Sequence, residues 1–66
     1  MRQWLVNARM GKNLTQQELA DKVGITRQFI GILENELTAT PHPNTAKKIA
    51  EVLGFDWTKF FEDDKE

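Results

Sequence analysis

Two neighbouring side chains, Arg27 and Gln28, have the chemistry needed to read a base pair from its edge. An arginine guanidinium can pair bidentately with guanine, and a glutamine carboxamide can do the same with adenine. Both residues follow Thr26, whose hydroxyl suits the N-cap of a helix, so they would occupy that helix's first turn. A helix in the major groove reaches base edges best with its first turn. The same side chains could instead be solvated surface, which is the commoner place for polar residues.

A glycine, Gly24, separates this segment from an earlier one that also favours a helix. Thr15 and Glu18 have the spacing of a capping box, which predicts a helix that runs to about Val23. Two helices that cross at about 90–120° need a tight turn, and glycine accepts the left-handed backbone that such a turn often requires. Ala20 supplies a small side chain where the two helices would approach each other. The pattern therefore predicts a helix-turn-helix.

Helical periodicity continues along the chain, without the sustained two-residue alternation that is typical of strands. We expect a first helix over residues 2–11 and a fourth that ends just before Gly54. Pro43 suits the first position of this fourth helix, although Asn44 could cap it instead. Asp56 is expected to cap a short fifth helix. The predicted fold is all-α, with five short helices around one core. The predicted core positions are Leu5, Ala8, Leu19, Ala20, Val23, Ile25, Ile30, Leu33, Ala46, Ile49, Ala50 and Leu53.

This arrangement resembles the Cro/CI-type (XRE) family of bacterial and phage DNA-binding domains over about residues 2–61. The residues that carry the resemblance are Arg9, 14-LTQQELADKVGI-25, Ile30, Leu33, 34-EN-35, 49-IAEVLG-54 and 60-FF-61. It implies a lambda-repressor-like fold whose helix-turn-helix is formed by the second and third helices. We accordingly expect a Cro/CI-type domain over residues 1–61 and a frayed acidic tail over residues 62–66.

The resemblance also implies roles for individual residues. Bases would be contacted by Arg27, Gln28 and Ile32, with the isoleucine against a thymine methyl. The DNA backbone would be contacted by Gln16, Thr26 and Asn35. Arg9 and Glu34 would form an internal ion pair. Simpler interpretations stay open for three of these residues: Gln16 as a helix former near a cap, Thr26 as a cap alone, and Ile32 as incidental exposure.

Two departures from the family pattern affect the expected interface. Glu36 stands where the family commonly has glycine after the third helix, so this helix end is expected to be strained or rebuilt. The loop over residues 37–43 lacks the Lys or Arg often found there, which predicts fewer phosphate contacts and a shallower salt dependence. The cations that could compensate, if they face the duplex, are Arg2, Lys12, His42, Lys47 and Lys48.

Three aromatic residues, Trp57, Phe60 and Phe61, lie close together near the end of the chain. This is more than a very short helix needs for packing alone. Two of the three are expected in the core. The third could form an isologous dimer patch, which makes this trio the candidate dimer surface. Phe29 raises the same question on the third helix, and the sequence does not decide it.

The composition of the chain argues against several classes of protein. The net charge of −1 hides an asymmetry, because residues 1–54 carry +2 and residues 55–66 carry −3. With no cysteine and one histidine, the chain cannot build a thiolate or multi-imidazole metal site, and we expect no cofactor. Neither a signal peptide nor a membrane-spanning run is present. No catalytic set or phosphate-cradling glycine loop appears, so we expect no enzyme.

We therefore expect a cytoplasmic, nucleoid-associated regulator of transcription that binds double-stranded DNA sequence-specifically. It would act as a repressor and as a homodimer on a pseudo-palindromic operator. The 66 residues leave no room for a sensor domain, so control would come through abundance, dimerisation or a protein partner. The alternative is a protein-interaction module on the same scaffold, either antitoxin-like or anchoring.

Overall fold

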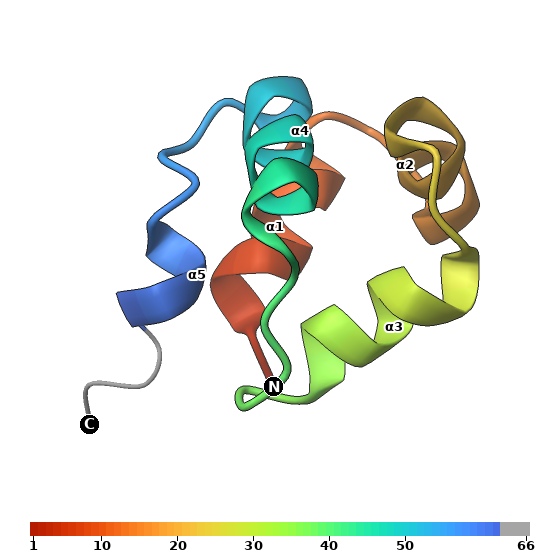
Figure 1. The fold of residues 1–66 in the computed structure, drawn as a ribbon. Coiled ribbons are helices and arrows are strands. Elements are labelled where there is room, and N and C mark those ends of the chain that lie inside the picture. Colours follow the sequence, from red (N-terminus) through yellow and green to blue (C-terminus); the bar gives the residue numbers. More distant parts are fainter. Residues whose placement is uncertain (63–66) are drawn as a thin grey trace.

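The computed structural model of the chain describes residues 1–62, which form five α-helices (Figure 1). They are α1 (Gln3–Gly11), α2 (Gln16–Val23), α3 (Arg27–Asn35), α4 (Pro43–Leu53) and α5 (Lys59–Glu62). The prediction of an all-α fold with five short helices is confirmed. Of the predicted acidic tail, residue 62 is the last residue of α5 and residues 63–66 lie outside the described part.

The helix-turn-helix has the predicted local geometry. The Thr15 hydroxyl accepts the backbone N–H of Glu18, and the Glu18 carboxylate accepts that of Thr15, which completes the capping box. Gly24 ends α2 with a left-handed φ of 84°, and its N–H donates to the carbonyl of Ala20. Figure 1 shows α2 and α3 together at one side of the molecule, where α2 also contacts α4. The turn residue therefore sets the angle at which α3 leaves α2.

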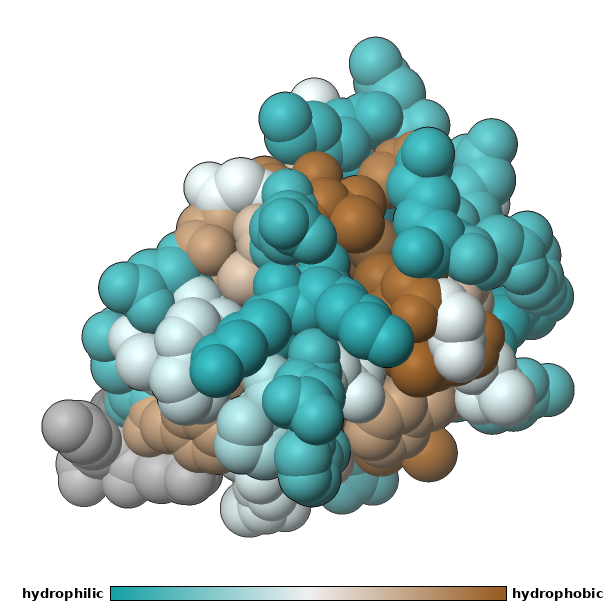
Figure 2. Space-filling view, turned by 45° about the horizontal axis from the view of Figure 1, so that its top comes forward, coloured by the Kyte–Doolittle hydropathy of each residue, from teal (hydrophilic) through white to brown (hydrophobic). Residues whose placement is uncertain are grey.

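One core joins the helices. Its buried members are Leu5, Leu19, Ala20, Val23, Ile30, Leu33, Ala46, Ile49, Leu53 and Phe60. Ala50 is buried as well, while Ala8 and Ile25 are half-buried against this core. Large hydrophobic side chains that stay exposed are Met1, Met10, Ile32 and Leu37. Figure 2 shows one face of the molecule, where hydrophobic surface appears between hydrophilic side chains.

The C-terminal aromatic residues are divided between core and surface. Phe60 is fully buried and makes edge-to-face contacts with Trp4 and Phe55, at centroid distances of 5.3 and 5.6 Å. The prediction of a candidate dimer surface is therefore wrong for Phe60, because its ring belongs to the core. Trp57 and Phe61 are only half-buried and contact each other edge-to-face at 5.7 Å. Of the three predicted residues, Trp57 and Phe61 stay available for such a surface.

The end of α3 is built without a glycine. Glu36 takes an ordinary extended conformation (φ −113°, ψ 111°), so its side chain causes no left-handed strain. Arg2 satisfies the carbonyls at this end: its guanidinium donates to Leu33, Glu36 and Leu37, and its backbone N–H donates to Glu34. The positive charge of Arg2 also interacts favourably with the partial negative charge at the C-terminus of α3. The helix end is thus rebuilt rather than strained.

The contacts of Arg2 also show that it is not one of the cations that could compensate at the DNA interface. Arg2 is fully buried, with its guanidinium carbon 5.3 Å from the centre of the Phe60 ring. It therefore does not face a duplex, although the sequence left that role open. No sequence pattern marked it as a core residue, because its partners lie more than 30 positions away along the chain.

Local side-chain hydrogen bonds precede the last two helices. Pro43 is the first residue of α4, as predicted, and His42 caps the helix by accepting the N–H of Asn44 at Nδ1, 3.1 Å away. Asp56 accepts both the N–H and the hydroxyl of Thr58, at 3.0 and 2.7 Å. The α5 helix proper starts only at residue 59, so Asp56 organises the turn before the helix. A fifth helix capped by Asp56 would include Trp57, and this expectation is wrong because α5 begins two residues after Trp57.

Candidate nucleic-acid interface

The first turn of α3 presents its side chains to solvent. Thr26 caps the helix, with its hydroxyl accepting the N–H of Phe29 at 3.1 Å. Arg27 and Gln28 are exposed, whereas Ile30, two positions further on, is fully buried. Packing of one side of α3 into the core therefore leaves the arginine–glutamine pair on the outside. Thr26 is thus a cap. Its side chain is also exposed, so the fold does not block a contact between Thr26 and DNA.

The exposed face continues to the end of the helix. Ile32 is 47% exposed, and Asn35 is exposed as well. Residues four apart on a helix lie on one face, so Gln28 and Ile32 form one outward row, and Arg27 and Asn35 border it. Phe29, by contrast, is half-buried against the core, which makes it mainly a packing residue. The four residues assigned to DNA contact on α3 beyond its cap thus share one surface.

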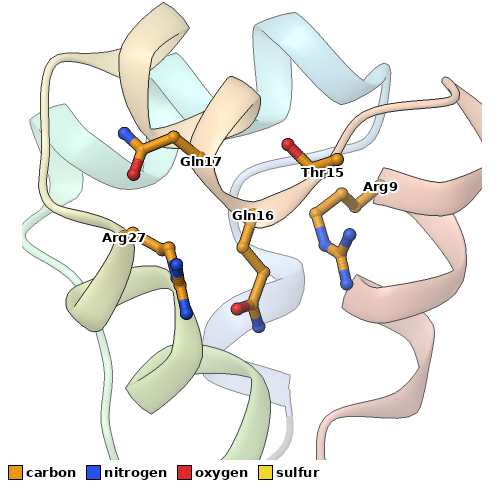
Figure 3. Close-up of a pocket in the computed structure, with 5 residues that line it drawn as sticks. All are labelled: Arg9, Thr15, Gln16, Gln17 and Arg27. Atoms are coloured by element: carbon orange, nitrogen blue, oxygen red, sulfur yellow. The ribbon is translucent and has the colours of Figure 1, made fainter.

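The start of α2 adds a second set of side chains to this surface. A shallow hollow of about 270 Å³ lies between the helices and is lined by Arg9, Thr15, Gln16, Gln17 and Arg27. Figure 3 shows the side chains of Gln16 and Arg27 running in the same direction, with Arg9 on the other side of Gln16. Backbone N–H groups at a helix N-terminus, together with guanidinium groups, favour an anion such as phosphate. The hollow therefore suits a phosphate group at the edge of the α3 surface.

A hydrogen-bonded network under the hollow fixes Gln16. Arg9 Nε donates to Glu34 Oε2 at 2.6 Å, and its Nη2 reaches Oε1 at 3.3 Å. Gln16 Nε2 donates to the same Oε1 at 2.9 Å. The side chains of Arg9 and Glu34 are 13% and 4% exposed, so the ion pair that the resemblance implied is largely buried. Because one N–H of the Gln16 amide is held by Glu34, its second N–H remains for another acceptor.

Other charged groups are engaged elsewhere on the protein. The ammonium of Lys47 lies 5.0 Å from the centre of the Trp57 ring, and that of Lys59 lies 5.3 Å from the Trp4 ring. The N–H of Thr58, and secondarily its hydroxyl, lower the pKa of Asp56 below its usual range. These groups support the α4–α5 side of the fold. Gln17 also lines the hollow, although no sequence pattern marked it as a contact residue; its place directly after Gln16 was the available signal.

The described residues hold no group of three or more His, Cys, Asp and Glu side chains that could bind a metal ion. Within residues 1–62, no helix is long and apolar enough to span a membrane.

A capped helix-turn-helix whose second helix exposes its first turn, with a polar hollow beside it, is the arrangement of a helix-turn-helix DNA-binding protein. The family described as helix-turn-helix matches residues 5–60, and this chain belongs to it, as a Cro/CI-type (XRE) member. Proteins of this family regulate transcription by binding DNA and are not enzymes. No solved structure matches the chain.

A curated relative supports the same assignment. The chain is 48% identical over 63 residues to a Bacillus subtilis (strain 168) protein named "Uncharacterized HTH-type transcriptional regulator YqaF". The aligned region covers 96% of this chain and 82% of that protein. The likeness therefore extends over nearly the whole chain, well beyond the helix-turn-helix itself.

Proposed function

We propose that this protein is a sequence-specific repressor of transcription that binds double-stranded DNA as a homodimer. The observation that carries the proposal is the joint exposure of Arg27 and Gln28 on the first turn of α3. Both side chains match base edges in the major groove, and nothing of the described fold covers them. Because bacterial DNA is in the cytoplasm, the protein would act there, at the nucleoid.

In the proposed complex, α3 lies in the major groove. Arg27 and Gln28 hydrogen-bond to base edges, and Ile32 contacts a thymine methyl group. Gln16 donates its second amide N–H to a phosphate in the hollow beside Arg27, while Thr26 and Asn35 contact the sugar–phosphate backbone at the two ends of α3. Phosphate contacts of this kind fix register and orientation, and the base contacts supply sequence preference.

Dimerisation would give this small interface useful specificity. One α3 helix reads only a few base pairs, and a two-fold dimer places two such helices about 34 Å apart, on half-sites separated by one turn of DNA. The half-buried pair Trp57 and Phe61 is the aromatic surface available for an isologous contact. Repression then follows from occupancy, since a dimer on an operator excludes other proteins from the same DNA.

Selection from a random duplex library tests the proposal directly. We expect the wild-type protein to enrich one pseudo-palindromic sequence, whose half-site spacing reports the oligomeric state. We also expect a footprint on this sequence and binding that weakens with salt. The competing function, a protein-interaction module, would instead give no enriched duplex, no footprint and a salt-tolerant complex with a protein partner.

Substitution of Arg27 separates base reading from general attraction. We expect Arg27→Ala to weaken binding to the selected duplex by about 1–3 kcal/mol and to relax the preference at one base pair. Lys22→Ala is the matched control, because Lys22 is an exposed cation that lines a different hollow, beside Val52. It should keep the full sequence preference. Equal binding of every duplex, including the selected one, by Arg27→Ala and wild type would contradict the proposed role.

A further inference from the structure

Gly31 occupies a position where a glycine is costly and no contact within the protein requires it. It lies in the middle of α3, where glycine is less favourable than alanine because it adds backbone entropy to the unfolded chain. Its backbone conformation is ordinary, since the glycines with positive φ are Gly24 and Gly54. A Cβ added at Gly31 would meet one atom within 4 Å, the Gln16 Nε2, at 4.0 Å.

That single neighbour does not explain the glycine either. A separation of 4.0 Å is ordinary van der Waals contact, so an alanine methyl group would fit beside the Gln16 amide. The hydrogen bond from Gln16 to Glu34 would stay in place, because a methyl group 4.0 Å from Nε2 does not displace the amide. The fold alone therefore tolerates, and by helix propensity favours, alanine at this position.

The place of Gly31 on the helix gives the missing reason. It lies one turn after Arg27 and one turn before Asn35, so the three residues form one row along α3. The outer residues of the row are exposed and carry long or polar side chains, while the centre carries none. The row therefore lacks a side chain at Gly31, next to Gln16 at the start of α2, and we call this gap between side chains the notch. Figure 3 shows the Gln16 and Arg27 side chains that flank the notch.

We propose that Gly31 is a DNA-contacting position, whose missing side chain lets the sugar–phosphate backbone of one strand pack directly on the α3 backbone. The inference rests on the proposed function. The strand concerned is the one whose phosphate is held by Gln16 in the hollow at the start of α2. The notch sets how deeply α3 enters the groove, and through that depth it controls whether Arg27 and Gln28 reach their bases.

The test is Gly31→Ala, because the proposal predicts effects of opposite sign on stability and on binding. The variant should melt at a higher temperature than wild type, by about 4–8 °C for a domain of this size. Its Kd for the duplex selected by the wild-type protein should rise by about tenfold, the cost of one displaced contact. A residue with a purely structural role would not move these two quantities in opposite directions.

Gly11→Ala is the matched control. Gly11 is the exposed last residue of α1, has no positive φ, and leaves its added Cβ without a neighbour within 4 Å. It should bind the selected duplex within about twofold of wild type, as expected of a surface substitution away from the interface. An unchanged or tighter Kd for Gly31→Ala overturns the inference while the proposed function stands. A lower melting temperature also overturns it, because the fold would then need the glycine. If wild type selects no duplex, the proposed function fails and the inference fails with it.

Discussion

At the scale of the residue, Glu34 connects the packing of the fold to the candidate interface. One carboxylate accepts hydrogen bonds from Arg9 on α1 and from Gln16 on α2, while Glu34 itself belongs to α3. Three helices therefore meet at two oxygen atoms that are almost entirely out of water. In such a setting, the loss of one partner leaves a buried charge without compensation, which costs far more than the loss of an exposed pair.

Substitution of Glu34 measures how much its carboxylate contributes to the free energy of unfolding. We expect Glu34→Gln to lower the free energy of unfolding by about 3–5 kcal/mol, because Arg9 loses its counter-charge in a largely buried site. Urea unfolding followed by circular dichroism measures the change. Glu51→Gln, an exposed α4 residue, is the control and should change stability by at most about 0.5 kcal/mol. Equal stabilities for the two variants would mean that water compensates the Arg9 charge.

Asp56 is a second residue whose effect on stability can be measured, because its ionisation makes the stability of the fold depend on pH. Its pKa is lowered from an ordinary value of 3.8, mainly by the backbone N–H of Thr58 and next by the Thr58 hydroxyl. Because the folded-state pKa lies below the unfolded one, the ionised group stabilises the fold above the unfolded pKa. This stabilisation disappears as the pH falls through the lower, folded-state pKa.

The corresponding experiment compares Asp56→Ala with wild type in urea across an acid pH series. The wild-type protein should be more stable at neutral pH, and the difference should shrink as the pH falls below about 4. Asp56→Asn keeps an acceptor that does not titrate, so its deficit at neutral pH should be smaller than that of alanine. A difference between Asp56→Ala and wild type that stays constant from neutral to acid pH would show that the charge plays no part.

At the scale of the element, the features that follow from neighbouring residues could be predicted from the sequence. The capping box at Thr15, the cap at Thr26 and the left-handed Gly24 each depend on residues a few positions apart, and the structure contains all three. The Pro43 start of α4 belongs to the same class. Spacing along one helix determines these features, so no knowledge of the tertiary fold was needed.

Features that depend on distant partners could not be predicted in the same way. The burial of Arg2 requires the carbonyls at the end of α3, and the burial of Phe60 requires Trp4 and Phe55. Arginine is mostly a surface residue, so its type argues against the burial of Arg2. Phenylalanine is often buried, but its type alone does not say which of Trp57, Phe60 and Phe61 enters the core. The candidate interface falls between these cases. The sequence placed Arg27 and Gln28 on the first turn of α3, but the hollow at the start of α2 emerged only from the packed helices.

The turn between α2 and α3 supports a test that isolates backbone strain. We expect Gly24→Ala to destabilise the protein by about 1–2 kcal/mol, because a residue with a Cβ resists its φ of 84°. The added Cβ has no neighbour within 4 Å, so a steric clash does not contribute. Gly11→Ala, where φ is not positive, should stay within about 0.5 kcal/mol of wild type. Thermal unfolding of the two variants distinguishes strain from a general intolerance of alanine.

At the scale of the whole molecule, the distribution of cations decides how this domain would respond to salt. Arg2 is buried under α3, and Lys47 and Lys59 lie over aromatic rings on the α4–α5 side. Around the hollow, the charge of Arg9 is compensated by Glu34, so Arg27 is the lining cation left for a phosphate. The other proposed backbone contacts come from neutral side chains. The local positive charge at the interface is therefore small, in agreement with a net charge of only −1 for the chain.

This distribution predicts a shallow salt dependence. Each phosphate neutralised by a cation contributes about −0.9 to the slope of log K against log salt concentration, so Arg27, the hollow's lining cation that is not paired with a carboxylate of residues 1–62, gives about −1 per protomer and about −2 per dimer. Fluorescence anisotropy with the selected duplex between 50 and 200 mM salt, roughly the range over which such slopes are resolved, measures it. Lys12→Ala should leave the slope unchanged, since Lys12 lines a different hollow with Lys22, whereas Arg27→Ala should reduce it by about 1 per protomer. A much steeper wild-type slope would instead mean that lysines outside the hollow, such as Lys12 or Lys48, contact the duplex, and the docking orientation would then have to turn toward them.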